Sequence, residues 1–279
     1  QQVQTAIEQK ADIIILLSGS PDALNGVIKQ AYDAGIVVIA SSCYVTSPYA
    51  IVVNTNNVQE GISSAKVIVE LLKGKGHVLA VDGAAGVASN TQIHAGYELI
   101  YGQNPGITVD YVNGDWTESK AKTECLKYFS THPGKVDAIE QQGGGMFMGC
   151  VSALEEAGRP LVPVVMGDVL ECELAFANNH KDDPGWGIAG HGNPAGSQAD
   201  AAFRMGIATA MGCGPKLSCV LGPSPSIDKD NFDEWYKEGM SEDSNVFIDP
   251  PDGWYLGQDQ LDLLFTTKPE FPAKTAMMP

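Results

Sequence analysis

Short runs of consecutive apolar residues alternate with amphipathic stretches along the whole chain. The first run occupies residues 13–17 and the second occupies 36–40. The stretch between them predicts a helix that opens after Pro21 and ends at Gly35, where a glycine suits the left-handed C-cap. The same cycle recurs downstream. It predicts further strands at 78–81, 108–112, 138–140, 162–166 and 187–189, and helices near 59–73, 90–102, 117–130, 146–157 and 170–179.

Strands that are apolar throughout, joined by helices of about three turns, are typical of parallel sheets covered on both faces. The pattern therefore predicts a doubly wound α/β fold with right-handed crossovers. Ligands of such folds bind at the carboxyl ends of the strands. The loops expected at those ends are rich in small and amide side chains; they are residues 18–22, 41–45, 82–90, 113–116, 141–147, 167–171 and 190–194.

Length and charge narrow the class of protein. The chain has 279 residues, of which 44% are hydrophobic and 18% charged, so it can bury a sizeable core. Its 34 acidic residues outnumber 17 basic ones, which gives a formal net charge of −17. Such a chain repels phosphate backbones and anionic lipid surfaces, so we expect no nucleic-acid partner. No apolar run approaches the roughly 18 residues that span a bilayer, so no membrane insertion is expected.

The sequence contains no recognisable catalytic, cofactor or metal motif. The loop at 83–86 follows a strand but lacks the GxGxxG pattern, and the glycines at 143–145 are not followed by Lys-Ser/Thr as in a phosphate loop. Those three glycines allow a close backbone approach, either by a ligand or by a neighbouring helix. The five histidines show no metal-ligand spacing, and no GxSxG elbow is present. The sequence therefore predicts no catalytic residue, metal or cofactor.

Two residues in the strand-end loops have alternative interpretations. Trp116 lies in a polar loop, where its indole either plugs the edge of the core or stacks on the apolar face of a ligand. His191 lies between two glycines at a strand end, where it serves either a ligand site or a hydrogen bond at a chain crossover. The residues alone do not decide between these alternatives.

Several segments, taken in order, resemble the type I periplasmic sugar-binding proteins, the ribose-binding protein group, over nearly the whole chain. Residues 11–42 resemble the family's second βαβ unit, and 54–72 resemble its first crossover with the helix that opens the second domain. Residues 81–98 resemble the family's glycine loop and the helix after it. Residues 114–139 and the sequence PVVMGD at 163–168 follow in the expected order and spacing. The basic helix-turn-helix of gene regulators with the same fold is not visible.

The resemblance implies two doubly wound parallel-sheet lobes joined by a three-strand hinge, with the ligand between them. It implies a first lobe of residues 1–55 plus 191–248, a second lobe of 56–190, and a last crossover and tail of 249–279. The family's first βα unit has no counterpart in this sequence. We expect that unit, preceded by a signal peptide, in the intact protein, because the sheet would otherwise expose an unpaired edge.

The resemblance further implies a substrate-binding protein of an ABC importer, located in the periplasm or at the cell surface. Such a protein captures a sugar, polyol or related hydroxylated metabolite by hinge closure. We expect it to work with a membrane permease, to be a monomer and to need no cofactor. Two alternatives stay open: a ligand-sensing receptor or regulator domain of the same fold, and an enzyme that uses Asp168 and His191.

The family's site residues match this sequence only in part. Its sugar-binding Asp matches Asp168, and its stacking aromatic matches Trp116, which favours stacking over the plug. Its Asp-Arg pair falls on Ser42 and Cys43, and a further Arg falls on Ile93. The loss of both arginines removes clamps for sugar hydroxyls, so we expect a different sugar, a polyol or a non-sugar metabolite. The predicted ligand-binding residues are Trp116, Asp168, Asn90, Thr91, Ser18, Ser42, Gln142, His191 and Asn193.

Six cysteines are too few for a disulfide scaffold, but an even number permits disulfides after export. Cys213 and Cys219 flank a short turn and are close enough in sequence to be bridged. Cys150 and Cys172 fall on consecutive predicted helices of the second lobe and form another candidate pair. The sequence therefore predicts disulfides at one or both of these pairs.

Overall fold

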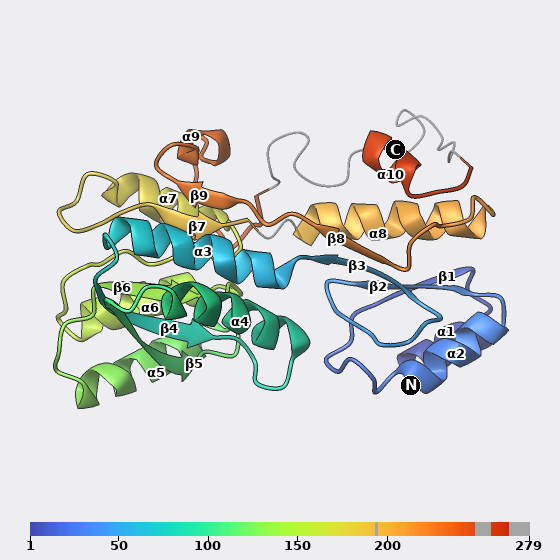
Figure 1. Cartoon of the computed structure of the whole chain (residues 1–279), viewed down its shortest axis with the longest axis horizontal. Helices are drawn as coiled ribbons and strands as arrows, with labels where there is room; N and C mark the ends of the chain where they lie inside the picture. The colour runs from blue at the N-terminus through green and yellow to red at the C-terminus, as the bar shows by residue number, and fades with distance from the viewer. Residues whose placement is uncertain (193–194, 249–257, 268–279) are drawn as a thin grey trace. The chain divides into compact units, whose positions relative to one another are not determined.

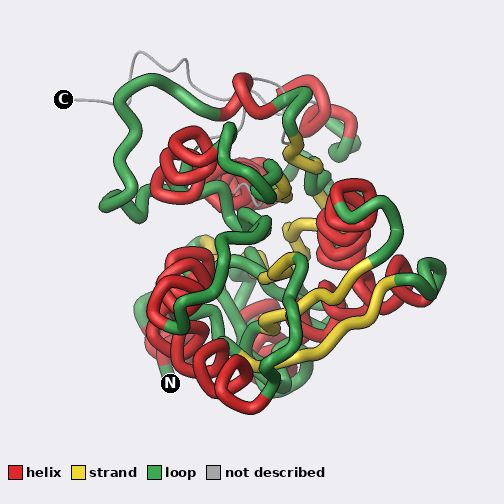
Figure 2. Tube along the Cα trace, turned by 90° about the vertical axis from the view of Figure 1, so that its left-hand side faces the viewer, coloured by secondary structure: helices red, strands yellow, loops and turns green. Residues whose placement is uncertain are grey.

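The chain passes back and forth between two units, each built around its own sheet (Figure 1). The computed structural model describes residues 1–192, 195–248 and 258–267. Within that part, the first unit contains 1–54, 197–222 and 258–267, and the second contains 55–192, 195–196 and 223–248. Strands alternate with helices along most of the trace, as Figure 2 shows. The predicted doubly wound α/β fold class is confirmed.

The first unit has a four-stranded sheet with the order β1 (Ile13–Leu16), β2 (Val37–Ser41), β3 (Ile51–Thr55) and β8 (Cys219–Gly222). The first three of these strands are parallel. Alternate strand residues point to opposite faces, so the strands contribute to two cores. One core packs against α1 (Gln2–Glu8) and α2 (Asn25–Asp33), the other against α8 (Ala195–Ala210) and α10 (Gln258–Leu263).

Strand β1 forms one edge of this sheet within the described residues. Ile15 and Leu17 are 43% and 72% exposed there. Exposed apolar side chains on an unpaired edge suit the addition of a further strand. The expected extra βα unit beside β1 remains a prediction.

The second unit has a three-stranded parallel sheet with the order β5 (Ile107–Asn113), β4 (Gly76–Asp82) and β6 (Ala138–Gln141). Parallel bridges from Ile139 to Val164 and from Met166 to Gly190 extend it to β7 (Ala189–His191). Strand β7 pairs antiparallel with β9 (Ser226–Asp228). The predicted strand at 162–166 is therefore present only as two bridges. The helices are α3 (Asn57–Leu71), α4 (Ala88–Gly102), α5 (Glu118–Thr131), α6 (Met146–Glu156), α7 (Glu171–His180) and α9 (Phe232–Trp235).

Helices α3 and α4 pack against each other at two glycines. A Cβ on Gly61 would overlap the carbonyl of Ile93, and a Cβ on Gly96 would lie 2.5 Å from the carbonyl of Val58. The absence of side chains at both positions lets the two backbones approach closely. This contact fixes the start of α3, which carries Glu60, against the core of the second unit.

The division into units differs from the predicted lobe boundaries at residues 191–196 and 223–248. Both segments belong to the second unit rather than the first. The reason is long-range pairing: Gly190 on β7 lies opposite Ile227 on β9, and Phe232 and Trp235 are buried at 2% and 1% exposure. The crossover predicted near 249–254 lies outside the described residues.

The cysteine pairs predicted from the sequence are not disulfides. All six cysteines lie in the described part of the chain, and all are free thiols in the structure. Cys150 contacts Cys125 instead of Cys172, with 3.9 Å between the sulfur atoms. Cys172 donates to the side-chain carbonyl of Asn245. Helix packing therefore gives Cys150 a partner that sequence spacing did not suggest.

None of the helices in the ranges described has the length and apolar character needed to cross a bilayer.

Candidate ligand-binding site

The carboxyl ends of the second unit's strands meet at one edge of its sheet, because the strands are parallel. β4 ends at Asp82, β5 at Asn113 and β6 at Gln141, and a loop follows each of them. Trp116 lies in the loop after β5. Asp168 follows the bridged segment that continues the same sheet. The topology thus gathers these loops where ligands of doubly wound folds bind.

Asp168 and Trp116 both contact a glycine loop that follows β6. Gly143, Gly144 and Gly145 have φ angles of 105°, 68° and 83°, a left-handed run that other residues rarely adopt. The N–H of Gly144 donates a hydrogen bond to the Asp168 carboxylate. A Cβ on Gly143 would lie 2.5 Å from the Asp168 carboxyl, and a Cβ on Gly144 would overlap Trp116. The close approach that the glycines permit is made by the carboxyl of Asp168 and by the Cα, Cβ and carbonyl oxygen of Trp116.

Trp116 is held between two stretches of backbone. It and Asp115 both have left-handed backbone angles, with φ of 56° and 53°. A Cβ on Gly83 would overlap the indole, so the ring lies flush against the loop after β4. The side chain of Trp116 is half-buried. The indole is therefore fixed in position and still partly accessible, as an aromatic stacking platform requires.

Gln142 connects the loops after β4 and β6. Its amide donates to a carboxylate oxygen of Asp82 over 2.8 Å and accepts from the N–H of Gly83 over 3.1 Å. The other carboxylate oxygen of Asp82 lies 2.9 Å from Nδ1 of His94. Burial raises the pKa of Asp82, and the contact with His94 opposes that rise. The side-chain amide of Gln142 is thus used mainly for hydrogen bonds that join two loops of the site.

Asn90 and Thr91 lie at the start of α4, where their roles differ. The side-chain oxygen of Asn90 is buried and has no hydrogen-bond partner within the part of the chain that the structure describes. Thr91 is exposed and donates over 3.4 Å to the carbonyl of Val87 in the same helical turn. Asn90 therefore has an unused acceptor, whereas the hydroxyl of Thr91 is occupied locally.

Asp168 is 6% exposed, and a different acid caps the helix that follows it. The buried Glu173 accepts hydrogen bonds from the N–H groups of Gly167 (3.2 Å) and Leu170 (3.0 Å), just before α7 begins. Burial, with the charge of Asp168 adding to it, raises the pKa of Glu173 to about 8. Asp168 is consequently not required as a helix cap. Across the described ranges, no group of three or more His, Cys, Asp or Glu side chains is arranged to hold a metal ion.

His191 is fully buried at the end of β7, not exposed in a loop. Its Nδ1 lies 3.4 Å from a carboxylate oxygen of Glu60, which is only 1% exposed. Sequence analysis did not single out Glu60, because a glutamate in the first turn of an amphipathic helix ordinarily faces water. Asn193, predicted beside His191, lies outside the described residues.

Ser18 and Ser42 belong to the first unit, at the carboxyl ends of β1 and β2. The hydroxyl of Ser18 donates over 2.6 Å to the carbonyl of Ser20. Ser42 has a left-handed φ of 53° and donates over 2.5 Å to the side-chain carbonyl of Gln198. Both lie at the edge where ligands of such sheets bind, and both remain predicted ligand contacts.

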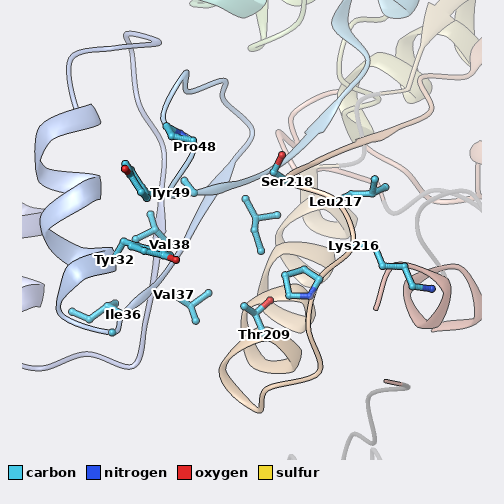
Figure 3. A pocket seen from close by; sticks show the side chains of 14 residues that line it. Tyr32, Ile36, Val37, Val38, Pro48, Tyr49, Thr209, Lys216, Leu217 and Ser218 are labelled. Atoms are coloured by element: carbon cyan, nitrogen blue, oxygen red, sulfur yellow. The ribbon is translucent and has the colours of Figure 1, made fainter. Parts of the chain in front are cut away.

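A cavity of about 670 Å³ opens at the opposite, amino-terminal ends of β2 and β3 (Figure 3). Tyr32 and Tyr49 line it, with ring centroids 5.0 Å apart, and Lys29 lies 5.3 Å from the centroid of Tyr49. None of the predicted ligand-binding residues lines this cavity. It is therefore distinct from the strand-end site.

The fold and the strand-end site define a bilobal α/β binding protein, and the comparisons with known proteins agree. Residues 1–212 match the periplasmic binding protein domain family, and the chain belongs to that family. The predicted resemblance to type I sugar-binding proteins is confirmed.

One curated relative is the xylitol-binding protein of Mycolicibacterium smegmatis (strain ATCC 700084 / mc(2)155). It is 28% identical over 174 residues, which cover 61% of this chain and 49% of the relative. The chain thus matches about half the length of that protein.

Solved structures show the same fold at low sequence identity. The Caulobacter myo-inositol binding protein, bound to myo-inositol, has a TM-score of 0.77 at 20% identity and covers 86% of this chain and 81% of its own. A solute binding protein from Mycobacterium smegmatis with bound glycerol has a TM-score of 0.76 at 23% identity. The match covers 86% of this chain and 82% of that protein. A solute binding protein from Thermobispora bispora DSM 43833 has a TM-score of 0.76 at 24% identity. The match covers 87% of this chain and 73% of that protein.

Proposed function

We propose that this protein captures a small hydroxylated solute, a polyol or a sugar, outside the cytoplasm and delivers it to the permease of an ABC importer. The observation that carries the proposal is the meeting of Trp116 and Asp168 on the Gly144 backbone. Membership of the periplasmic binding protein family supports the extracytoplasmic location. The relative named for xylitol and the neighbours with bound myo-inositol and glycerol support the ligand class.

The chemistry of these two side chains suits a polyol. The C–H groups of a polyol chain or sugar ring pack on an indole face, while its hydroxyl groups donate to a carboxylate. Hydrogen bonds to a charged acceptor are worth roughly 1.5–3 kcal/mol each. The hydrogen bond from the N–H of Gly144 stabilises the ionised form of the Asp168 carboxyl, which is the stronger acceptor.

The positions where the family has arginines hold Cys43 and Ile93, so the site has fewer cationic clamps. Ile93 is 3% exposed and belongs to the core of the second unit. Neither side chain can bind two adjacent hydroxyls as a guanidinium does. We infer that the preferred ligand is small and flexible, which favours a linear polyol over a hexose ring. Binding, not turnover, is the proposed activity.

The test is calorimetric titration with xylitol, myo-inositol, glycerol and D-allose, after a thermal-shift screen of the same compounds. We expect at least one of them to bind without being converted. Asp168→Asn, which keeps the shape but removes the charge, is expected to weaken that affinity tenfold or more, since about 1.4 kcal/mol is a factor of ten.

Asp33→Asn serves as the matched control, because Asp33 is an exposed helix residue paired with Lys29 in the first unit. It is expected to leave affinity unchanged. Unchanged affinity in Asp168→Asn would overturn the assigned site. Formation of a product, lost in Asp168→Asn, would overturn the binding function in favour of an enzyme.

A further inference from the structure

Glu60 and His191 form a buried pair for which the proposed ligand contacts give no role. Glu60 lies in the first turn of α3 and His191 ends β7, and both belong to the second unit. The carboxylate and ring are 1% and 0% exposed, and Nδ1 lies 3.4 Å from the nearer carboxylate oxygen. Within the described ranges, neither carboxylate oxygen of Glu60 and neither ring nitrogen of His191 has a hydrogen-bond partner. Two polar groups so deeply buried are costly unless they satisfy each other.

The pair is joined to the Asp168 segment through β7. The N–H of His191 donates over 3.0 Å to the carbonyl of Met166, two residues before Asp168. Gly190 bridges Met166 in parallel, and a Cβ on Gly190 would lie 3.0 Å from Met166 Cβ. Helix α3, strand β7 and the segment that ends at Asp168 therefore form one connected unit. A displacement of His191 would be transmitted to Asp168 over two residues of backbone.

Burial decides how the pair carries its proton. Burial raises the pKa of Glu60 well above its usual value, and the charge of Asp168 raises it further. Burial lowers the pKa of His191 to about 4, while the facing carbonyl of Gln141 opposes part of that fall. Tyr97 also senses the charge of Glu60, although its pKa is raised mainly by its own burial. Both shifts favour the uncharged forms, in which the Glu60 carboxyl can donate a hydrogen bond to a neutral imidazole.

We propose that Glu60 and His191 share one proton as positioning residues, which hold the segment ending at Asp168 against α3 and so aim the Asp168 carboxylate at a polyol. This role rests on the proposed function only for the identity of the ligand. The positioning itself has a readout that needs no ligand: the amide proton of Gly144, which donates to Asp168.

The first experiment records the Gly144 amide resonance by NMR in protein labelled with ¹⁵N-glycine. In the wild type we expect the resonance to lie downfield, because the acceptor is a carboxylate. In Glu60→Leu and His191→Leu we expect it to move upfield and its hydrogen exchange to accelerate at least tenfold. Glu60→Gln is expected to keep the wild-type position, because its amide can still donate to the imidazole.

Glu140→Gln is the matched control. Glu140 is a carboxyl of equal burial in the same unit, held by hydroxyl donors from Ser64 and Tyr101. Its variant is expected to leave the Gly144 resonance in place. If Glu60→Leu also leaves the Gly144 resonance in place, the positioning role is overturned.

If the apolar variants fail to fold, titration of the His191 ring in the wild type decides. A ring that titrates near 6.5 overturns the shared proton, and a ring that stays neutral to about pH 4 supports it.

The second experiment measures the affinity for xylitol in the same variants. We expect about a tenfold loss in Glu60→Leu, and rescue to near the wild-type value in Glu60→Gln. Loss of affinity in Glu60→Gln equal to that in Glu60→Leu would overturn the proton-sharing role. If the wild type binds none of the four polyols and sugars, the proposed function fails, while the Gly144 resonance still decides the positioning role.

Discussion

The side-chain carboxylate of Asp168 accepts a hydrogen bond from the backbone N–H of Gly144, and the same glycine leaves room for Trp116. Gly144 has a left-handed φ of 68°. A residue with a Cβ at this position would combine backbone strain with a collision. The geometry of both proposed ligand contacts thus depends on one glycine.

Gly144→Ala should therefore disturb the site more than a glycine substitution ordinarily would. We expect the free energy of unfolding to fall by about 2–5 kcal/mol, from roughly 1–2 kcal/mol of left-handed strain and a further 1–3 kcal/mol of overpacking against Trp116. Urea denaturation measures this loss. Gly145→Ala is the control, because Gly145 has a φ of 83° but open space around its Cβ position. Equal losses in the two variants would show that the collision is absent.

Trp116→Leu should separate stacking from structural support. We expect the affinity for xylitol to fall at least tenfold, because an aliphatic side chain offers no flat face to the ligand. The melting temperature should fall as well, since the indole packs on Gly83. Trp186→Leu is the control: that indole packs edge-on against Phe147 and Phe176 and lies in the segment that precedes β7. It should lower the melting temperature and leave affinity intact; a similar affinity loss in both variants would contradict stacking.

The sequence predicts local elements well because each depends on neighbouring residues. The apolar run at 36–40 became β2, and the run at 78–81 became the centre of β4. Strand β3 (Ile51–Thr55) was not predicted, although Ile51, Val52 and Val53 form an apolar run of their own. Its polar end, Asn54 and Thr55, resembles the start of the family's first crossover instead.

The features that sequence analysis missed depend on contacts between distant segments. Residues 223–248 were assigned to the first lobe, because no local pattern reveals that β9 pairs with β7. Glu60 resembles a solvated helix residue until His191, far along the chain, is placed against it. Trp116 and Asp168 were chosen by resemblance. Their meeting on Gly144 required the fold, although the three consecutive glycines had already indicated a close backbone approach.

Glu140 should make the protein less stable as the pH rises. Burial raises the pKa of this carboxyl from 4.5 to about 7. Between those values the folded state holds a proton that the unfolded state releases. The stabilisation that this group contributes is therefore fully present below pH 4.5 and is lost as the pH rises through 7. The loss is at most about 1.4 kcal/mol per pH unit. The free energy of unfolding, measured with urea at pH 5 and at pH 7.5, should differ less between the two pH values in Glu140→Gln than in the wild type. An identical difference in both proteins would contradict the assigned titration.

Cys125 and Cys150 should form a disulfide if the protein folds under oxidising conditions. Their sulfur atoms lie 3.9 Å apart between α5 and α6, and both side chains are fully buried. A disulfide requires about 2.05 Å between the sulfurs, so the two sulfur atoms must approach each other by nearly 2 Å.

Oxidation of this pair is expected during folding rather than afterwards. In the native state the hydrogen bond with Cys125, together with burial, raises the pKa of the Cys150 thiol well above its usual value, so little thiolate is present to react. Refolding with oxidised glutathione supplies the oxidant: the two thiols lose two protons and two electrons, and glutathione disulfide is reduced to two glutathione thiols. Peptide mapping by mass spectrometry should then find a disulfide between Cys125 and Cys150, with the other four cysteines open to alkylation.

The variant Cys125→Ser is the control, and it should abolish this disulfide without creating another. A link between Cys213 and Cys219, or between Cys150 and Cys172, would show instead that proximity in sequence, not helix packing, selects the partners.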